Sequence, residues 1–322
     1  MEAPIFKTPI RLNYIPLTLL VAVILWGSNN AITKYLVASW PPLFIGVTRF
    51  LIAGVILLGL ARYVPWLGSS NALSPSLRRR LWTRGAFNLA LYIIAFNVAM
   101  AYTTASHVAL YLGTAPVWAL LWEGRPRWNF KSLKSYGAAI LALSGVVFLF
   151  WPALKLGGSA WVGEVLGLAS SILWTIYGRD CRAFRTELSP AEISGHTFIR
   201  GSVILIPLAA WELYHYLNSH TSAPFFQPRL LLLQSYCIIA SGVIAFILWS
   251  NALRHWPVSK VYLFNNLIPI STMLWAFLLI QEPITSTFWP AMGLICGGVL
   301  FGQTQWEIFF KRRFLSSSSN SP

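Results

Sequence analysis

One stretch of the sequence, residues 105 to 123, carries four side chains with the chemistry to contact a small ligand. They are spaced at i, i+4, i+7 and i+11, which places them on one face of a helix. These residues are His107, Tyr111, Thr114 and Trp118. Such a face can form one wall of a binding site for a polar or aromatic molecule.

Similar polar and aromatic side chains recur in other apolar stretches. The predicted substrate-binding residues are Trp26, Asn30, Tyr92, Asn97, Tyr111, Trp118, Trp174, Tyr177, Trp249, Phe264, Asn265 and Asn266. An Asn side chain in hydrocarbon is costly unless it is paired, so we expect the Asn residues to face a bundle interior or a wet cavity. Two interpretations stay open for each Asn, ligand contact or hydrogen bonding between helices. For each Trp, packing or lipid contact stays open.

Two arginines, Arg49 and Arg200, lie within apolar stretches. Inside a cavity, either could bind a substrate carboxylate through two hydrogen bonds. Each also lies within about two turns of the end of its stretch, so the side chain could instead extend to the membrane interface. The short distance to the end favours the second interpretation.

Acidic residues lie near the ends of the apolar stretches. The single Asp, Asp180, falls in a connection, and the glutamates near ends are Glu123, Glu164, Glu212, Glu282 and Glu307. Proton-driven carriers usually place Asp, Glu or His near the membrane midplane. The sequence therefore favours facilitated or exchange transport over strict proton antiport.

Motifs for enzymatic chemistry are missing from the sequence. It has no HExxH, no GxSG with a partnered His, no pair of intramembrane Asp residues and no P-loop. Its three cysteines have neither disulfide nor metal-ligand spacing. We expect no enzymatic activity, no cofactor and no metal.

The candidate residues belong to a chain that is mostly apolar. Of 322 residues, 56% are hydrophobic and 10% are charged, whereas soluble domains are about a quarter charged. Apolar runs of roughly 20 residues, the length of a bilayer-crossing helix, recur throughout. We predict an all-α polytopic membrane protein with ten transmembrane helices, at about 14–37, 42–62, 82–102, 105–123, 134–152, 160–179, 193–213, 230–251, 258–280 and 288–309.

The positive charge follows the connections between these helices. The net charge is +15, and with a cytoplasmic N-terminus only Lys34, Lys155 and Arg229 fall at outer ends. Because basic residues favour the cytoplasmic side, we expect both termini inside the cell. Because the positive charge is spread over short connections, we expect the protein to contact the lipid bilayer and not nucleic acid. The Ser-, Pro- and Arg-rich stretch 61–84 is predicted to be a loop, and residues 310–322 a disordered tail.

A repeat relates the two halves of the chain. SHVALYLGTAPVWALLW, from residue 106, aligns with SKVYLFNNLIPISTMLW, from residue 259, and includes Pro116 opposite Pro269. The repeats are predicted over 14–152 and 160–309, five helices each. An odd number inverts the second repeat in the membrane, so a substrate site is expected near the midplane between them, with alternating access. Each proline is predicted to bend its helix around the site as a hinge.

The second repeat contains SKVYLFNNLIPISTMLWAFLLIQEPIT followed by GLICGGVLFG. This pattern resembles the EamA-type repeat of the drug/metabolite transporter superfamily. The resemblance implies a basket-shaped carrier, usually an exporter of amino acids or other small metabolites. It implies a cavity lined mainly by helices 1, 3, 4, 6, 8 and 9. The Trp residues deep in the apolar stretches favour substrates with an aromatic or other apolar side chain.

Two positions of the family pattern are asymmetric in this chain. The family acid after the ninth helix matches Glu282, but its equivalent in the first repeat is Asn129. The family basic residue early in the second helix matches Arg49, and the equivalent position in the second repeat is Thr197. A carrier of phosphorylated substrates, such as nucleotide sugars or sugar phosphates, is the alternative, and a membrane-embedded enzyme is a weaker one.

The expected location is the plasma membrane, which is the inner membrane in a bacterium. The substrate is expected to be a small molecule and the carrier to act as a monomer.

Overall fold

The computed structural model describes residues 14–64, 67–68, 73–123, 130–156, 160–219, 226–255, 261, 264 and 267–303. These residues form helices joined by turns, and no strand occurs among them. The protein is an all-α membrane protein, with ten spans in two inverted five-helix repeats around a central cavity. Several spans are built from more than one helical piece.

The first repeat contains five spans. The third span joins α3, η2 and α4 end to end, and the fourth is split into α5 and α6. The elements are α1 (Ile15–Val37), α2 (Pro42–Tyr63), α3 (Pro75–Arg80), η2 (Leu81–Ala86), α4 (Phe87–Tyr102), α5 (Ala105–Leu112), α6 (Ala115–Glu123) and α7 (Phe130–Leu156).

The second repeat follows the same order. Its third span again contains a π-helical piece, η3, and α13 forms the described part of its fourth span. The elements are α8 (Ala160–Phe184), α9 (Pro190–Ser219), α10 (Pro228–Tyr236), η3 (Cys237–Ala245), α11 (Phe246–His255), α13 (Ile268–Ile280) and α14 (Phe288–Gln303).

Length and apolarity agree with a membrane location. Five described helices are long and apolar enough to cross a bilayer, and shorter apolar helices cover 136–148, 268–280 and 288–301. Large apolar side chains remain exposed on the outside of the bundle, among them Val55, Ile140 and Leu278. A bilayer supplies the apolar surroundings that such a surface needs.

The expected loop over 61–84 is wrong in its second part. A helix begins at Pro75, where Ser74 Oγ accepts a hydrogen bond from Leu77 N at 3.2 Å. Pro fits the first helical position, because its missing N–H would have no partner there. Leu77 and Leu81 are buried against α8 and α9, so this segment extends the third span.

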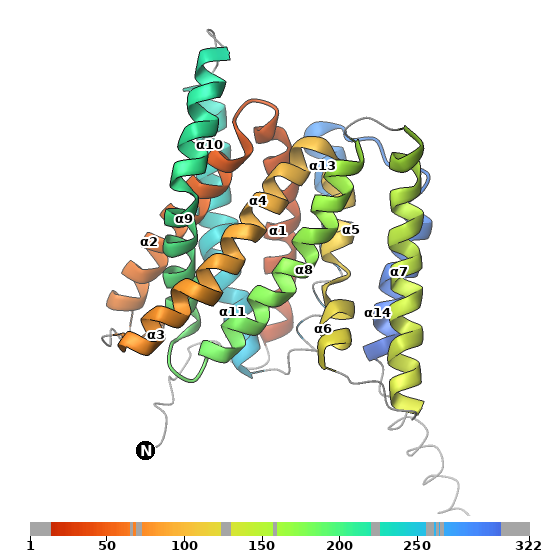
Figure 1. Cartoon of the computed structure of the whole chain (residues 1–322), viewed down its shortest axis with the longest axis horizontal. Helices are drawn as coiled ribbons and strands as arrows, with labels where there is room; N and C mark the ends of the chain where they lie inside the picture. The colour runs from red at the N-terminus through yellow and green to blue at the C-terminus, as the bar shows by residue number, and fades with distance from the viewer. Residues whose placement is uncertain are drawn as a thin grey trace, which may run out of the picture.

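The strongest helix packing joins the two repeats. The helix α2 packs against α9, α7 against α14, α4 against α8, and α1 against α13. Figure 1 shows α7 and α14 side by side at one edge of the bundle. Because every one of these pairs takes one helix from each repeat, neither repeat completes its own core.

The α7–α14 pair shows why the repeat carries matching glycines. An added Cβ on Gly145 would lie 2.9 Å from Ala291 O, and one on Gly298 would lie 2.7 Å from Ala142 N. Both distances are too short for a side chain. Small residues at a helix interface let membrane helices approach closely.

Both repeat prolines lie in the first turn of a helical piece. The fourth span breaks at Gly113 and Thr114, and α6 begins one residue before Pro116. In the ninth span, α13 begins at Ile268, one residue before Pro269. Both prolines are buried. In the fourth span the interruption therefore precedes the proline, and in the ninth span the described helix begins just before it, so the hinge role stays a prediction.

Candidate functional site

A small cavity lies between the repeats. Its volume is about 60 Å³, enough for a few water molecules. The lining residues come from α1, α2, α4, α5, α8, η3, α11 and α13, together with Gly113 at the break in the fourth span. The expected helices 1, 3, 4, 6, 8 and 9 all contribute, and the second span contributes as well.

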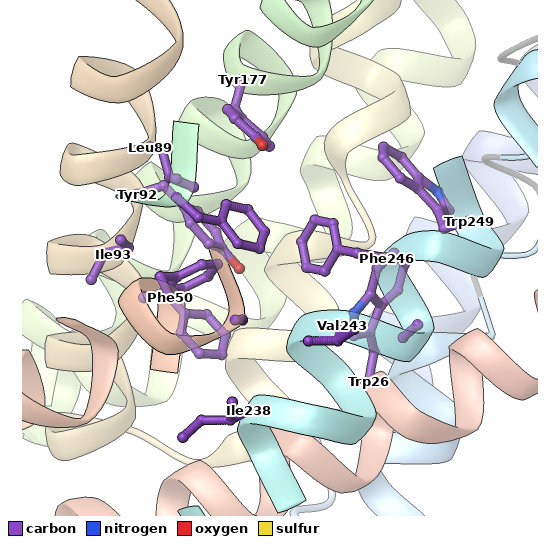
Figure 2. Close-up of a cluster of buried hydrophobic side chains, with 14 of the residues drawn as sticks. Trp26, Phe50, Leu89, Tyr92, Ile93, Tyr177, Ile238, Val243, Phe246 and Trp249 are labelled. Carbon is purple, nitrogen blue, oxygen red and sulfur yellow. The ribbon is translucent and has the colours of Figure 1, made fainter. Parts of the chain in front are cut away.

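Six of the fourteen residues that line the cavity are aromatic. Figure 2 shows Trp26, Tyr92, Phe246 and Trp249 converging from α1, α4 and α11. The ring centroids of Trp26 and Phe246 lie 5.4 Å apart, and those of Trp26 and Trp249 lie 5.8 Å apart. These separations are typical of favourable edge-to-face pairs. This aromatic part of the wall suits an apolar or aromatic group.

Arg49 is a buried cation in this wall. Its residue is only 3% exposed, and the side chain lines the cavity. Nη1 donates a hydrogen bond to Asn29 Oδ1 at 3.0 Å. The guanidinium also lies 4.5 Å from the centroid of Phe50 and 5.6 Å from that of Phe96. The expectation that Arg49 extends to the interface is therefore wrong, because a neutral amide and two aromatic rings hold it inside.

The partners of Arg49 leave its charge uncompensated. Asn29 Oδ1 accepts from both Arg49 and Ser241 Oγ, the latter at 2.7 Å. Among the residues that the structure describes, no carboxylate forms an ion pair with Arg49. Buried charges are normally paired. The cavity therefore has one positive charge and a shortage of negative charge.

Five of the predicted residues line the cavity together, and two more join the surrounding rings. The lining residues are Trp26, Asn30, Arg49, Tyr92 and Trp174. Asn30 Nδ2 also donates to Thr272 Oγ1 at 3.0 Å, which ties α1 to α13. Trp249 and Tyr177 each pack against Trp174, with centroid separations of 5.9 and 5.7 Å.

Other predicted contacts lie away from the lining. Asn97 Nδ2 donates to Ile93 O within α4, and Trp118 Nε1 donates to Thr114 Oγ1. Phe264 packs against the main apolar core. Asn265 and Asn266 lie outside the described residues, so substrate contact by them stays a prediction.

Arg200 is in a different environment from Arg49. Its Nη1 contacts His196 Nδ1 at 3.0 Å and donates to His196 O at 3.1 Å, one turn earlier in α9. The guanidinium lies 5.7 Å from the centroid of the exposed Trp82 ring. Arg200 is not among the residues that line the cavity, and its place beside an exposed Trp agrees with extension toward the interface.

The sequence did not single out Asn29 or Ser241 as site residues. Both belong to the wall, together with Phe50, Phe96 and Phe246. The signal for Asn29 was weak but present, because an in-span Arg needs an acceptor and adjacent asparagines lie in the preceding helix. Ser241 had no such signal, since it reaches Asn29 only through packing of the two repeats.

A second polar cluster lies at the turn between α4 and α5. The Glu164 carboxylate accepts hydrogen bonds from Thr103 Oγ1 and, at 2.6 Å, from Tyr111 OH, and it contacts His107 Nδ1 at 2.9 Å. The Glu282 carboxylate accepts from Ala105 N at 2.9 Å. Tyr111 therefore belongs to this cluster, although it was predicted to contact substrate.

One solved protein has a similar fold. A crystal structure matches with a TM-score of 0.58 and 20% identity, covering 91% of this chain and 98% of the other. This match supports the fold alone.

Several curated relatives are named as transporters. An uncharacterized transporter of Archaeoglobus fulgidus is 23% identical over 86% of this chain and 92% of its own length. The uncharacterized inner membrane transporter YedA of Escherichia coli K12 is 25% identical over 86% of each chain. A probable biotin transporter of Pseudomonas aeruginosa is 27% identical over 61% of this chain and 66% of its own.

The model of the EamA-like transporter family matches twice, at residues 13–151 and 161–302. The two matches fall on the two structural repeats and together cover most of the chain. With ten spans, two inverted repeats and a cavity between them, the chain belongs to the EamA-like transporter family.

Proposed function

We propose that this membrane transporter exports small metabolites that carry a carboxylate, such as amino acids, by alternating access between its two repeats. The observation that carries the proposal is Arg49, a buried cation whose hydrogen-bond partner is a neutral amide. A substrate carboxylate would supply the missing negative charge. Charge-assisted hydrogen bonds to a guanidinium are strong and directional, so this contact would also orient the substrate.

The rest of the wall supports an apolar body on the substrate. Trp26, Trp174 and Phe246 border the cavity, and aromatic faces suit aliphatic and aromatic side chains. The Asn30 amide also lines the cavity, and its carbonyl oxygen offers an acceptor for an α-ammonium group. Biotin, named for one relative, combines a carboxylate with an apolar chain, which is the same chemistry.

Phosphorylated substrates are the weaker alternative. A phosphate group carries up to two negative charges, and sites for it usually combine several cationic groups or backbone N–H groups. Among the lining residues, which are all described, Arg49 is the only charged one. One guanidinium matches one carboxylate better. An enzymatic role has no support from the family, whose members here are named as transporters.

The transport cycle needs the cavity to open at each membrane face in turn. The break in the fourth span and the start of α13 lie at the cavity, since Gly113 and Ile268 line it. An added Cβ on Gly113 would lie 3.4 Å from Pro269 Cγ, so the fourth and ninth spans meet there. These contacts support a hinge in each repeat. The basic residues between spans support cytoplasmic termini in a plasma membrane.

A counterflow assay in proteoliposomes tests the proposed function. The probes are L-phenylalanine, L-leucine and biotin, compared with glucose 6-phosphate. We expect exchange of at least one carboxylate probe and none of the sugar phosphate. Arg49→Gln should lower that exchange by about tenfold or more, because a charge-assisted hydrogen bond contributes roughly 1.5–3 kcal/mol.

Arg200→Gln is the matched control, because it makes the same substitution at an in-span Arg that lies outside the cavity. It should retain exchange within about twofold of the original protein, as expected for a site that does not touch the substrate. Equal losses in the two variants, or exchange of glucose 6-phosphate in preference to the carboxylates, would contradict the proposal.

A further inference from the structure

The α4–α5 turn of the first repeat is held by two carboxylates of the second repeat. Glu164 comes from the first turns of α8 and is 3% exposed, and Glu282 follows α13 and is 8% exposed. Neither residue lines the cavity. Their burial and their partners therefore need an explanation other than direct substrate contact.

Glu282 caps the start of α5. Its oxygens accept from Ala105 N at 2.9 Å and from Ser106 N at 3.1 Å, and also from Ser106 Oγ at 2.7 Å. The first N–H groups of a helix have no intrahelical partner, and a carboxylate there also interacts favourably with the helix dipole. The cap is unusual because its carboxylate is distant in sequence and belongs to the other repeat.

Glu164 holds the same turn from the other side. It accepts from Thr103 Oγ1 in the turn and from Tyr111 OH, while His107 Nδ1 contacts its Oε1. The backbones also meet here, because an added Cβ on Gly163 would lie 2.8 Å from Thr103 N. All three side-chain partners of Glu164 thus come from the first repeat.

These contacts lie at one end of the helices that form the cavity. Toward the membrane centre, Tyr92 of α4, Leu112 of α5 and Trp174 of α8 line it. Lys34 Nζ of α1 donates to Met100 O at 2.8 Å, which adds a further helix to the same end. Opening of the cavity at this end would require the α4–α5 turn to separate from Glu164 and Glu282.

The positions equivalent to Glu164 and Glu282 in the first repeat do not carry acidic residues. The early helices of the two repeats align at an offset of 148 residues (Leu25-Trp26 with Leu173-Trp174) and the later ones at 153. The equivalent of Glu164 is therefore Pro16, and that of Glu282 is Asn129. Neither can supply a carboxylate. An inverted repeat would otherwise give both ends matching contacts. The contacts of Glu164 and Glu282 with the α4–α5 turn therefore have no carboxylate equivalents in the first repeat.

We propose that Glu164 and Glu282 form the outer gate of the carrier, and that release of the α4–α5 turn from these two carboxylates opens the cavity to the outside. The two residues are positioning residues, acting on the balance between the two access states rather than on the substrate. This proposal rests on alternating access in the proposed function, but it does not depend on substrate identity.

The gate is tested by thiol labelling in intact cells. Leu112→Cys places a thiol at the cavity wall, and a membrane-impermeant maleimide reaches it only when the outer end opens. The native three-cysteine protein gives the background. Glu164→Gln and Glu282→Gln, each combined with Leu112→Cys, should raise the labelling rate about tenfold, because each removes charge-assisted hydrogen bonds from the closed state.

Milder variants keep the test decisive if a Gln variant does not fold. Tyr111→Phe and Ser106→Ala each remove one hydroxyl that donates to these carboxylates, and should raise labelling about threefold. The matched control is Glu212→Gln. Glu212 also joins the repeats, since its Oε2 accepts from Leu43 N at 2.9 Å in α2, but it does not touch the α4–α5 turn.

The gate variants are Glu164→Gln, Glu282→Gln, Tyr111→Phe and Ser106→Ala. A labelling rate that rises in these variants and stays within about twofold in Glu212→Gln supports the gate. Unchanged labelling in all four gate variants, with each eluting as a folded protein, would overturn it. An equal rise in Glu212→Gln would overturn it too, because any contact between repeats would then suffice. A rise only in inside-out vesicles would overturn the assignment to the outer face. The assay uses no substrate, so failure of the carboxylate proposal leaves these outcomes unaffected.

Discussion

Arg49 in the cavity and Glu164 at the α4–α5 turn are equally buried charges with opposite surroundings. Glu164 has three side-chain partners, and one of them is the imidazole of His107. Arg49 has one neutral amide and two aromatic faces. Buried charges are normally paired, and a substrate carboxylate could supply the partner that Arg49 lacks. The contrast supports the two proposals, closure by the carboxylate cluster and substrate recognition in the cavity.

Supplying Arg49 with an internal carboxylate should abolish its difference from Glu164, because both charges would then be paired. We expect this change to have the largest effect on substrate exchange. Asn29→Asp is nearly isosteric and puts a negative charge at the oxygen that already accepts from Arg49. A substrate carboxylate would then meet an occupied, neutralised site. We expect exchange of carboxylate probes to fall by about a hundredfold or more, with two charge-assisted hydrogen bonds lost, as measured by counterflow.

Asn29→Ala is the control for Asn29→Asp, because it removes the amide without adding a charge. It should keep exchange within about tenfold of the original protein, since it removes one hydrogen-bond acceptor. If Asn29→Asp exchanges carboxylate probes as well as Asn29→Ala does, Arg49 is not the carboxylate site.

Breaking the saturated cluster should mainly cost stability. Glu164→Ala leaves His107 and Tyr111 without their buried acceptor, and removal of one partner from a buried charge pair costs about 3–5 kcal/mol. The free energy of unfolding in mixed micelles measures this loss. Arg49→Gln should cost less than Glu164→Ala, because Arg49 makes fewer polar contacts. The reverse order would contradict the comparison.

Substitution within the aromatic wall should produce a smaller, selective effect. Trp174→Phe changes a lining residue, whereas Trp118→Phe changes an indole that is bonded to Thr114 outside the lining. We expect Trp174→Phe to alter the ratio of phenylalanine to leucine exchange by about threefold to tenfold, as one aromatic contact is reduced. Trp118→Phe should leave this ratio unchanged, and an equal shift in both would extend the site along α6.

Much of the fold could be predicted from the sequence, because membrane spans are local features. Apolar run lengths gave most spans within a few residues, as for 42–62 against Pro42–Tyr63. The segment from Pro75 was missed because its basic residues resemble a loop, although its buried Leu77 and Leu81 support a helix. The prolines were predicted to bend their helices as hinges, and this stays a prediction, because Pro116 and Pro269 each lie in the first turn of a described helix.

The site was only partly predictable, because its decisive contacts are tertiary. Trp26, Tyr92 and Trp174 were predicted from the sequence, and they line the cavity in the structure. It could not orient Arg49, since the direction of that side chain depends on Asn29 in the neighbouring helix. It also could not pair Glu164 with His107, because these residues meet only when the second repeat is inverted against the first.

The central claim is that Arg49 recognises a carboxylate, and a comparison of acid and amide binding tests it most directly. The measurement is the ratio of Kd values for L-phenylalanine and L-phenylalaninamide, taken in the original protein and in Arg49→Gln. We predict that the acid binds at least about tenfold more tightly in the original protein and that this preference disappears in Arg49→Gln. The same preference for the acid in both proteins would contradict the account.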